Sequence, residues 1–307
     1  MIKKTLYFGN PAYLSTSLGQ IVVRIPGDDE PAGDDAERKR ARTVPIEDVG
    51  FVILDNDRIT LTHNLIGELL ANNCAIVSCG KNHLPAGMML SVTGNTVHGE
   101  RTRRQTEASL PLKKQLWQQT VRCKIANQAA VLEYATGEPH PNMLSWASKV
   151  RSGDPDNIEG RAAAYYWKTI FPVPDGFTRE RYGEAPNNLL NYGYAILRAV
   201  IARALVGSGL LPVLGIHHHN RYNSYCLADD VMEPYRPYVD RLVYDLVHEY
   251  DSLELNTRMK SRLLSIPSMD VSIDGHRSPL MIAAATTAAS LAKCYTSEAR
   301  RVIYPEL

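Results

Sequence analysis

The stretch from Leu211 to Asp240 reads LPVLGIHHHNRYNSYCLADDVMEPYRPYVD and holds three consecutive histidines, followed by three acidic residues within five positions. The residues from Leu227 to Glu233 are expected to form a short helix that ends at Pro234, because proline disfavours a helical conformation in the residue before it. Asp230 and Glu233 are three residues apart, so both carboxylates project from one helical face. Two like charges held so close are unfavourable unless a cation or an arginine lies between them. A carboxylate at such a helix break, with a histidine on the preceding loop, is compatible with half of a metal site.

A purely structural interpretation of the same residues stays open. Acidic residues early in a helix favour the positive end of the helix dipole, and Asp229 fits that description. His217, His218 and His219 cannot easily bind one ion together, because successive side chains of an extended segment point to opposite sides. Spacing alone does not decide between a metal site and ordinary helix chemistry.

The composition is ordinary for a globular protein, with 44% apolar and 22% charged residues among 307. The formal net charge is only +1, so a nucleic-acid surface must be a local patch. Five cysteines without CxxC spacing favour a reducing cytosol over a disulfide framework. The apolar run at the N-terminus is too short for a signal peptide, and the window from Leu280 to Ala292 is shorter than the ~20 residues that cross a bilayer. We expect a soluble, cytoplasmic protein without membrane association.

Residues 1–95 are expected to form a small β domain. A short helix from His63 to Ala71, with Thr62 as its N-cap, interrupts the strands. Asp55 to Asp57 has the composition of a hairpin turn. The expected strands are short runs of Val, Ile, Leu and aromatic residues bounded by turn residues: Thr5 to Phe8, Ile21 to Ile25, Phe51 to Leu54, Ile59 to Leu61, Ala75 to Ser78 and Met88 to Val92.

Two segments have compositions that do not favour a packed core. Residues 27–43, GDDEPAGDDAERKRART, hold six acids followed by four bases and no large apolar residue, so we expect a mobile loop. Within it, Arg38 to Arg40 fits a solvated charge run better than a phosphate contact. Residues 96–104 follow a change in composition near Gly94 and are expected to be a linker.

Residues 105–307 are expected to form a larger all-α domain. The helices are amphipathic or apolar segments, most of them ended by glycine or proline: Leu110 to Ala135, Ile158 to Phe171, Asn188 to Val206, Tyr235 to Tyr250, Asn256 to Leu264 and Pro279 to Tyr295. The sequence therefore predicts an α+β protein in which a β domain precedes a helical one.

Glu159 is the best distant partner for the acidic residues near Glu233. It opens a helix and is followed by Gly160 and three alanines, whose small side chains let a ligand or another backbone approach. A competing interpretation is a capping box, because Asp156 stands three residues before Glu159 and the glutamate would then cap its own helix. Both interpretations remain open at this point.

Several motifs resemble, in the same order, those of the CRISPR-associated Cas1 proteins, the metal-dependent integrases of spacer acquisition. The resemblance covers essentially the whole chain, and the compact length and the MEPYRP wording look most like members from type II systems. The matching segments are EGRAAAYYW at 159–167, NLLNYGY at 188–194, GIHH at 215–218 and LADDVMEPYRP at 227–237, with PIEDV at 45–49 and Leu61-Thr62 in addition.

The resemblance implies a β-sandwich N-terminal domain and a helical catalytic domain. The family's metal triad falls on Glu159, His218 and Glu233, with Asp230 beside them as an outer residue. Two carboxylates and one imidazole suit Mg²⁺ or Mn²⁺, which would stabilise the charge that develops at a scissile phosphodiester. Arg236 and Arg241 are candidates for holding DNA phosphates, although Arg241 is also placed to pair with Asp245 one helical turn later.

The function predicted in this way is a metal-dependent DNA endonuclease and integrase that inserts short DNA fragments into a CRISPR repeat array by 3′-hydroxyl attack on a phosphodiester. Two other classes stay open: a non-catalytic DNA-binding scaffold, and a general metal phosphohydrolase. The implied partners are double-stranded DNA (prespacer and repeat), a second copy in a homodimer, and a dimer of the small Cas2 protein in a heterohexamer. The effector nuclease of a type II system is a further candidate partner.

Overall fold

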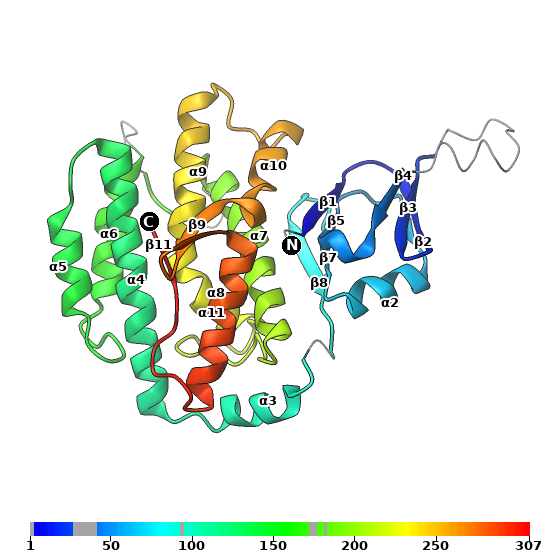
Figure 1. The fold of residues 1–307 in the computed structure, drawn as a ribbon. Coiled ribbons are helices and arrows are strands. Elements are labelled where there is room, and N and C mark those ends of the chain that lie inside the picture. The colour runs from blue at the N-terminus through cyan, green and yellow to red at the C-terminus, as the bar shows by residue number, and fades with distance from the viewer. Residues whose placement is uncertain (1–2, 27–41, 93–94, 172–176, 181–182) are drawn as a thin grey trace, which may run out of the picture. The chain divides into compact units, whose positions relative to one another are not determined.

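The computed structural model describes residues 3–26, 42–92, 95–171, 177–180 and 183–307, and combines helices with strands (Figure 1). The chain divides into two compact units, residues 1–94 and 95–307. Most of the segment expected to be a mobile loop, residues 27–41, lies outside the described residues. Its last two residues, Arg42 and Thr43, belong to a strand instead.

The first unit contains two four-stranded sheets, with strand orders β1-β5-β7-β8 and β4-β3-β2-β6. Their strands are β1 (Lys4–Phe8), β2 (Ala12–Ser17), β3 (Gln20–Arg24), β4 (Arg42–Pro45), β5 (Val49–Leu54), β6 (Ile59–Leu61), β7 (Ala75–Cys79) and β8 (Pro85–Met89). One apolar core joins both sheets to helix α2 (His63–Ala71): it includes Leu14 and Ile21, Val52 and Ile76, and Leu65. As expected, Thr62 caps α2, accepting a hydrogen bond from the backbone N–H of Leu65.

The expectation of a hairpin turn at residues 55–57 is wrong. β5 and β6, which flank this segment, belong to different sheets, so it connects the two layers and does not fold one strand back on the other. Asp55 accepts hydrogen bonds from the Tyr7 hydroxyl at 2.5 Å and from Nδ1 of His83 at 2.8 Å. A buried carboxylate is stable only with such partners, and these hydrogen bonds hold Asp55 directly after β5.

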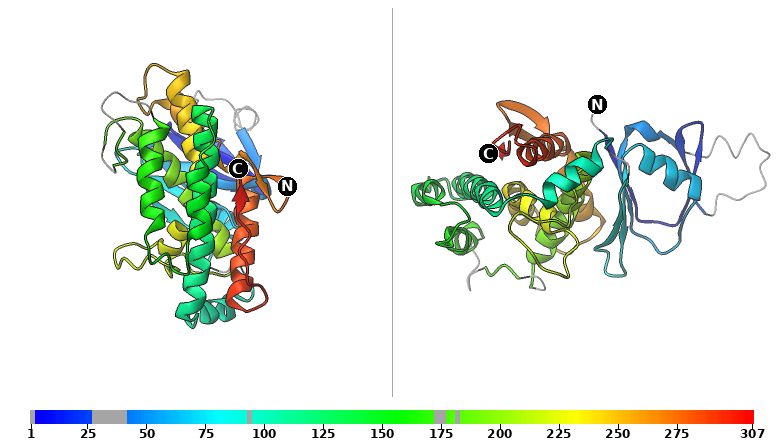
Figure 2. Two further views of the ribbon diagram at one scale, coloured as in Figure 1. Left: turned by 90° about the vertical axis from the view of Figure 1, so that its left-hand side faces the viewer. Right: turned by 90° about the horizontal axis from the view of Figure 1, so that it is seen from below.

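The second unit is built around two long helices, α4 (Leu110–Thr136) and α7 (Asn187–Gly207) (Figures 1 and 2). α4 packs against α5, α6 and α9, and α7 packs against α8, α9 and α11. The other helices are α3 (His98–Thr106), α5 (Pro141–Lys149), α6 (Ile158–Ile170), α8 (Cys226–Met232), α9 (Arg236–Glu249), α10 (Thr257–Leu263) and α11 (Leu280–Tyr295), with 3₁₀ turns η1 (Ile46–Asp48, in the first unit), η2 (Glu233–Tyr235) and η3 (Ile266–Ser268). Among the helices of the described ranges, α7 alone is long and apolar enough to cross a membrane, but most of it is buried in this unit, as in a core helix.

Two expectations for the second unit are wrong. It is not all-α, because β9 (Asp270–Ile273), β10 (His276–Pro279) and β11 (Pro305–Glu306) form an antiparallel sheet of order β10-β9-β11. The segment expected to be a linker is helix α3. That helix is held by polar contacts: Arg101 donates to the carbonyl of Ser208 at 2.8 Å, and Gln105 donates to the carbonyl of Leu211 at 3.0 Å. Apolar periodicity cannot reveal a helix that is anchored in this way.

Candidate active site

Glu159 on α6 and Glu233 on η2 meet at the side chain of Lys124 on α4. The Nζ atom of Lys124 lies 2.6 Å from Oε1 of Glu159 and 2.7 Å from Oε2 of Glu233. The lysine side chain is 11% exposed, compared with 23% for Glu159 and 6% for Glu233. Two carboxylates that are 74 positions apart in the chain are therefore brought to one point around a buried positive charge.

The start of α6 leaves the Glu159 side chain available for this contact. Asn157 is the N-cap and accepts a hydrogen bond from the N–H of Gly160 at 3.2 Å. Asp154 accepts from the N–H groups of Ile158 and Glu159, both at 2.9 Å. Other side chains thus satisfy the first N–H groups of the helix, and the capping-box role considered for Glu159 is not observed.

Glu233 stands where Pro234 ends α8 and the chain turns into η2. Its Oε1 lies 3.1 Å from Nη2 of Arg236. Burial alone would raise the pKa of Glu233, but the charges of Arg236 and Lys124 outweigh it and hold this pKa below its usual value. The side chain is therefore an anion at neutral pH. Because two cations face it, one on each oxygen, it is held in a fixed orientation.

Asp230 does not share a cation with Glu233, contrary to the expectation from their spacing. Its carboxylate is fully buried and accepts hydrogen bonds from the N–H groups of Ile216 at 2.6 Å, His217 at 2.9 Å and His218 at 3.3 Å. It also lies 2.5 Å from Nδ1 of His218. Asp230 thus anchors the loop that carries the histidines, and these bonds solvate its charge in place of a cation.

This loop requires glycine at position 215. A Cβ atom there would lie 2.2 Å from the carbonyl oxygen of His218 and 3.0 Å from Oδ2 of Asp230.

The hydrogen bond to Asp230 raises the pKa of His218. Since a carboxylate only accepts, Nδ1 of His218 carries the hydrogen and Nε2 is the nitrogen left for a ligand.

The two neighbouring histidines have different surroundings. The ring of His217 stacks on Trp117 of α4, with 4.3 Å between ring centroids and 3° between the planes. Burial lowers the pKa of His217, and the adjacent His218 lowers it further. His219 is exposed. Of the three, His218 is the one whose ring is fixed by a buried carboxylate.

The remaining predicted residues have other partners. Asp229, in the first turn of α8, lies 2.6 Å from Nε of Arg198 and also accepts a hydrogen bond from Asn223 at 2.7 Å. Arg236 lies 4.8 Å above the ring of Tyr194, in addition to its contact with Glu233. The other candidate for phosphate contact, Arg241, lies 3.9 Å above the ring of Tyr134, and the Tyr134 hydroxyl donates to Asp245 at 2.9 Å.

Within the part of the chain that the structure describes, no group of three or more His, Cys, Asp or Glu side chains is close enough to hold one metal ion. The donor set nevertheless fits a cation, because Glu159 and Glu233 already converge on the ammonium of Lys124. Oε2 of Glu233 is buried and accepts no hydrogen bond of good geometry from the described residues, although Nζ lies 2.7 Å away. A hard ion that prefers oxygen would satisfy this atom.

Sequence reasoning missed Lys124, because lysine on a long helix is usually at the surface. A signal was present in the spacing. Trp117, Val121, Lys124 and Gln128 recur at helical intervals on one face of α4, and all four are buried. A lysine on an otherwise buried face needs a negative partner.

Asn127, one turn after Lys124, connects α4 to two other segments. Its Nδ2 donates to the carbonyl of Pro234 at 2.8 Å and to that of Pro305 at 3.0 Å, and its Oδ1 accepts from the N–H of Leu307 at 3.1 Å. The amide therefore fixes the backbone directly after Glu233 relative to α4 and β11.

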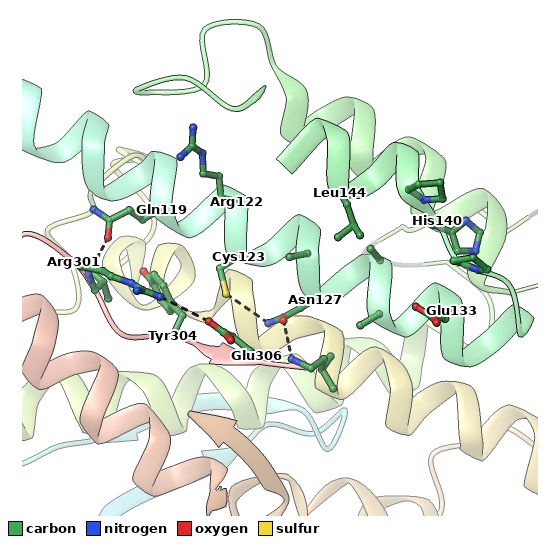
Figure 3. Close-up of a pocket in the computed structure, with 17 residues that line it drawn as sticks. Gln119, Arg122, Cys123, Asn127, Glu133, His140, Leu144, Arg301, Tyr304 and Glu306 are labelled. Atoms are coloured by element: carbon green, nitrogen blue, oxygen red, sulfur yellow. Dashed lines mark hydrogen bonds and ion pairs between the residues drawn. The ribbon is translucent and has the colours of Figure 1, made fainter. Parts of the chain in front are cut away.

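A groove of about 790 Å³ runs along another side of α4 (Figure 3). Its wall includes Arg122 and Cys123 of α4, His140 before α5, and Arg301 and Tyr304 near β11. Among the described residues that line it, the two glutamates around Lys124 and His218 are absent. This groove is thus separate from the candidate active site.

Comparison with known proteins defines the class. A family model described as CRISPR associated protein Cas1 matches residues 7–255. The CRISPR-associated endonuclease Cas1 of Neisseria meningitidis serogroup C (strain 8013) is 34% identical over 279 residues, which cover 89% of this chain and 86% of the relative.

Solved structures of low sequence identity share the fold. A casposase bound to its integration product superposes with a TM-score of 0.77 at 19% identity, covering 98% of this chain and 92% of the casposase. A chain of a Cas6-RT-Cas1–Cas2 complex gives a TM-score of 0.73 at 19% identity, over 97% of this chain and 35% of the other. The family model and the relative define one class, that of the CRISPR-associated Cas1 proteins, and the solved structures share its fold. The chain belongs to the Cas1 family.

Proposed function

We propose that this protein is a metal-dependent DNA integrase and endonuclease that inserts short DNA fragments into a CRISPR repeat array, with a DNA 3′-hydroxyl attacking a phosphodiester. One observation carries the proposal: Glu159 and Glu233, from separate helices, converge on a single cation, the ammonium of Lys124, and the charges of both glutamates help to raise the pKa of His218. Family membership supports the reaction class, and this convergence supports the choice of residues.

Glu159, Glu233 and Nε2 of His218 would hold Mg²⁺ or Mn²⁺, which supplies charge stabilisation at the phosphorus and the leaving oxygen. The protein's own part is to keep the ligands in place. Arg236 holds one oxygen of Glu233 at 3.1 Å, and Asp230 fixes the tautomer and the orientation of His218. Strand transfer needs no protein nucleophile, so the buried tyrosines of this unit need no covalent role.

A strand-transfer assay with a labelled duplex, with and without Mn²⁺, tests the proposal. Glu159→Gln, Glu233→Gln and His218→Ala should each nearly abolish the product, because each removes a ligand. His219→Ala is the matched control, since His219 is the adjacent histidine and the ring bonded to Asp230 is that of His218. Mn²⁺-dependent strand transfer that survives both Glu159→Gln and His218→Ala, in protein that still melts cooperatively, would refute the proposed site.

The same assay separates the other two functions. A non-catalytic DNA scaffold predicts DNA binding that is indifferent to divalent metal and to Glu159→Gln. A general phosphohydrolase predicts turnover of a chromogenic phosphate ester in the absence of DNA. An integrase predicts joined DNA strands and no turnover of the small ester.

We further propose that the protein works as a homodimer on double-stranded DNA, with a Cas2 dimer between two such dimers. Two comparisons support these partners: the fold is shared with a chain of a Cas6-RT-Cas1–Cas2 complex and with a casposase bound to its integration product. The first unit also leaves edge strands available for pairing, at β1 and β8 of one sheet and at β4 and β6 of the other. Light scattering at micromolar concentration should give twice the mass of one chain, and a clean monomer would contradict the dimer.

A further inference from the structure

We propose that Lys124 is a tethered competitor of the metal ion: it occupies the position between Glu159 and Glu233 in the metal-free protein and must withdraw when the ion binds. The inference rests on the proposed function and adds to it the device that sets how tightly the ion is held. Lys124 is not one of the three ligands predicted for the ion.

The geometry carries the inference. The ammonium lies 2.6 Å from one carboxylate and 2.7 Å from the other, which is the distance of a charge-assisted hydrogen bond to each. An ion that takes the same two oxygens would bring a second positive charge next to the ammonium. Like charges this close, in a site where the lysine side chain is only 11% exposed, repel strongly. The ammonium and the ion therefore exclude each other.

The charges around the site lead to the same conclusion. Without an ion, the two carboxylates of Glu159 and Glu233 are balanced by the cations of Lys124 and Arg236. A divalent ion added to this arrangement would bring two further positive charges to two carboxylates that are already balanced by two cations. Arg236 contacts the other oxygen, Oε1, of Glu233 and does not occupy the shared position. Lys124 is consequently the cation that has to leave.

The side chains are suited to such an exchange. Lysine carries its charge on a flexible four-carbon stem, so the ammonium can move while the helix stays in place. Glu159 is the more exposed of the two carboxylates, at 23% against 6% for Glu233, so its side of the site is the open one. The ammonium can swing past Glu159 toward solvent or toward an incoming phosphate. Until an ion arrives, it prevents the two carboxylates from repelling each other.

A permanent structural ion pair is the alternative, and it makes opposite predictions. If Lys124 only stabilises the fold, its removal weakens the protein with and without metal and does not tighten metal binding. If it competes with the ion, its removal destabilises the metal-free protein and strengthens metal binding. The two explanations are therefore distinguished by the coupling free energy between the charge of Lys124 and metal binding.

The test uses the full chain and Mn²⁺ alone, at about pH 8 so that protons do not compete for the carboxylates. Binding is measured from the electron paramagnetic resonance signal of free Mn²⁺, and stability from thermal unfolding with and without saturating Mn²⁺. The variants are Lys124→Met, which keeps an unbranched chain as far as the ε-carbon and removes the ammonium, and Lys124→Arg, which keeps the charge. Lys124→Met should bind Mn²⁺ about tenfold more tightly than the wild type, within the ~5 to 150-fold range of common coupling effects.

Lys124→Met should also melt at a lower temperature than the wild type without metal, and saturating Mn²⁺ should remove most of this deficit. Lys124→Arg should bind Mn²⁺ no more tightly than the wild type. Mn²⁺ affinity that is unchanged or weaker in Lys124→Met, or a deficit in melting temperature that Mn²⁺ does not reduce, would overturn the inference. Lys124→Gln, a polar and uncharged replacement, decides the question on the same two measurements if Lys124→Met does not fold.

The outcome for the wild type separates this inference from the proposed function. Wild-type protein that binds Mn²⁺ no better than the Glu159→Gln, Glu233→Gln double variant contradicts the metal site itself, and with it both proposals. Wild-type protein that binds Mn²⁺ through these residues, combined with no gain in Lys124→Met, contradicts only the role of Lys124.

Discussion

Replacing Asp230 by asparagine gives a sharp prediction, because asparagine keeps the shape of the side chain and removes its charge. The carboxylate accepts from three backbone N–H groups, at 2.6, 2.9 and 3.3 Å, and lies 2.5 Å from Nδ1 of His218. Asparagine offers one oxygen and one NH₂ group in place of two oxygens. If its oxygen keeps the N–H groups of Ile216 and His217, its NH₂ group faces the N–H and Nδ1 of His218.

Asp230→Asn should lower both the free energy of unfolding and the rate of strand transfer. Two contacts to a charged acceptor are lost, each worth roughly 1.5–3 kcal/mol, so the free energy of unfolding should fall by roughly 3–6 kcal/mol. An NH₂ group beside Nδ1 also favours the tautomer of His218 with hydrogen on Nε2, the nitrogen needed for a ligand. Strand transfer should therefore fall by about 10 to 100-fold, less than in Glu159→Gln, because the ligands themselves remain.

Urea unfolding and the strand-transfer assay measure the two effects on the same preparation. Asp229→Asn is the matched control, since Asp229 is the preceding residue and its partner Arg198 is 41% exposed. Asparagine keeps one acceptor oxygen there, so the free energy of unfolding should fall by less than in Asp230→Asn, by roughly 1.5–3 kcal/mol for one contact to a charged acceptor. An Asp230→Asn protein within ~1 kcal/mol of the wild type, with strand transfer reduced less than twofold, would refute the anchoring role given to this carboxylate.

Three further predictions concern other parts of the chain. Gly215→Ala should reduce strand transfer more than ~10-fold, because the added Cβ would lie 2.2 Å from the carbonyl oxygen of His218. Gly67→Ala is the control, since nothing lies within 4 Å of its added Cβ. It should leave activity unchanged and stabilise α2 by roughly 0.5–1 kcal/mol. Burial raises the pKa of Asp240 from 3.8 to about 7, so the folded protein keeps a proton that the unfolded chain has lost, and its contribution to stability should decline as pH rises through 7. Urea unfolding should show that Asp240→Asn removes this decline, and an unchanged slope would contradict it. Arg241→Ala should weaken DNA binding similarly on all sequences and lower the salt slope by about 1, and an unchanged slope would exclude a phosphate contact.

The long helices were predictable because each carries its own start and stop signals. α4 begins and ends within one residue of the expected segment, where Ser109 caps its start and Gly137, with a φ of 75°, ends it. α3 was not predictable, because charged residues fill its sequence and its contacts are made by Arg101 and Gln105 to distant carbonyls. The sheet of β9, β10 and β11 was missed for a similar reason: β11 has two residues, and its pairing with β9 is set by tertiary contacts.

The candidate site was predictable in its residue types and less so in its connections. The spacing of Asp230 and Glu233 points to the helix end at which the candidate site lies, but the two carboxylates bind different groups. Asp230 binds the N–H groups of a loop 12–14 residues earlier in the chain, and Glu233 binds Lys124. Contacts across 35 and 109 positions, such as those of Lys124 with Glu159 and Glu233, leave no local pattern in the sequence.

The three hydrogen bonds of Asn127 limit how this protein can be recombined with its relatives. The same amide holds the carbonyl of Pro234, the carbonyl of Pro305 and the N–H of Leu307. A chimera that exchanges residues 305–307 without α4, or α4 without the MEPYRP segment, would combine segments from different parents that no longer match at the hydrogen bonds of Asn127. The resulting mismatch would move the backbone beside Glu233 without altering any ligand. Successful chimeras should therefore inherit α4, residues 232–237 and residues 305–307 from one parent.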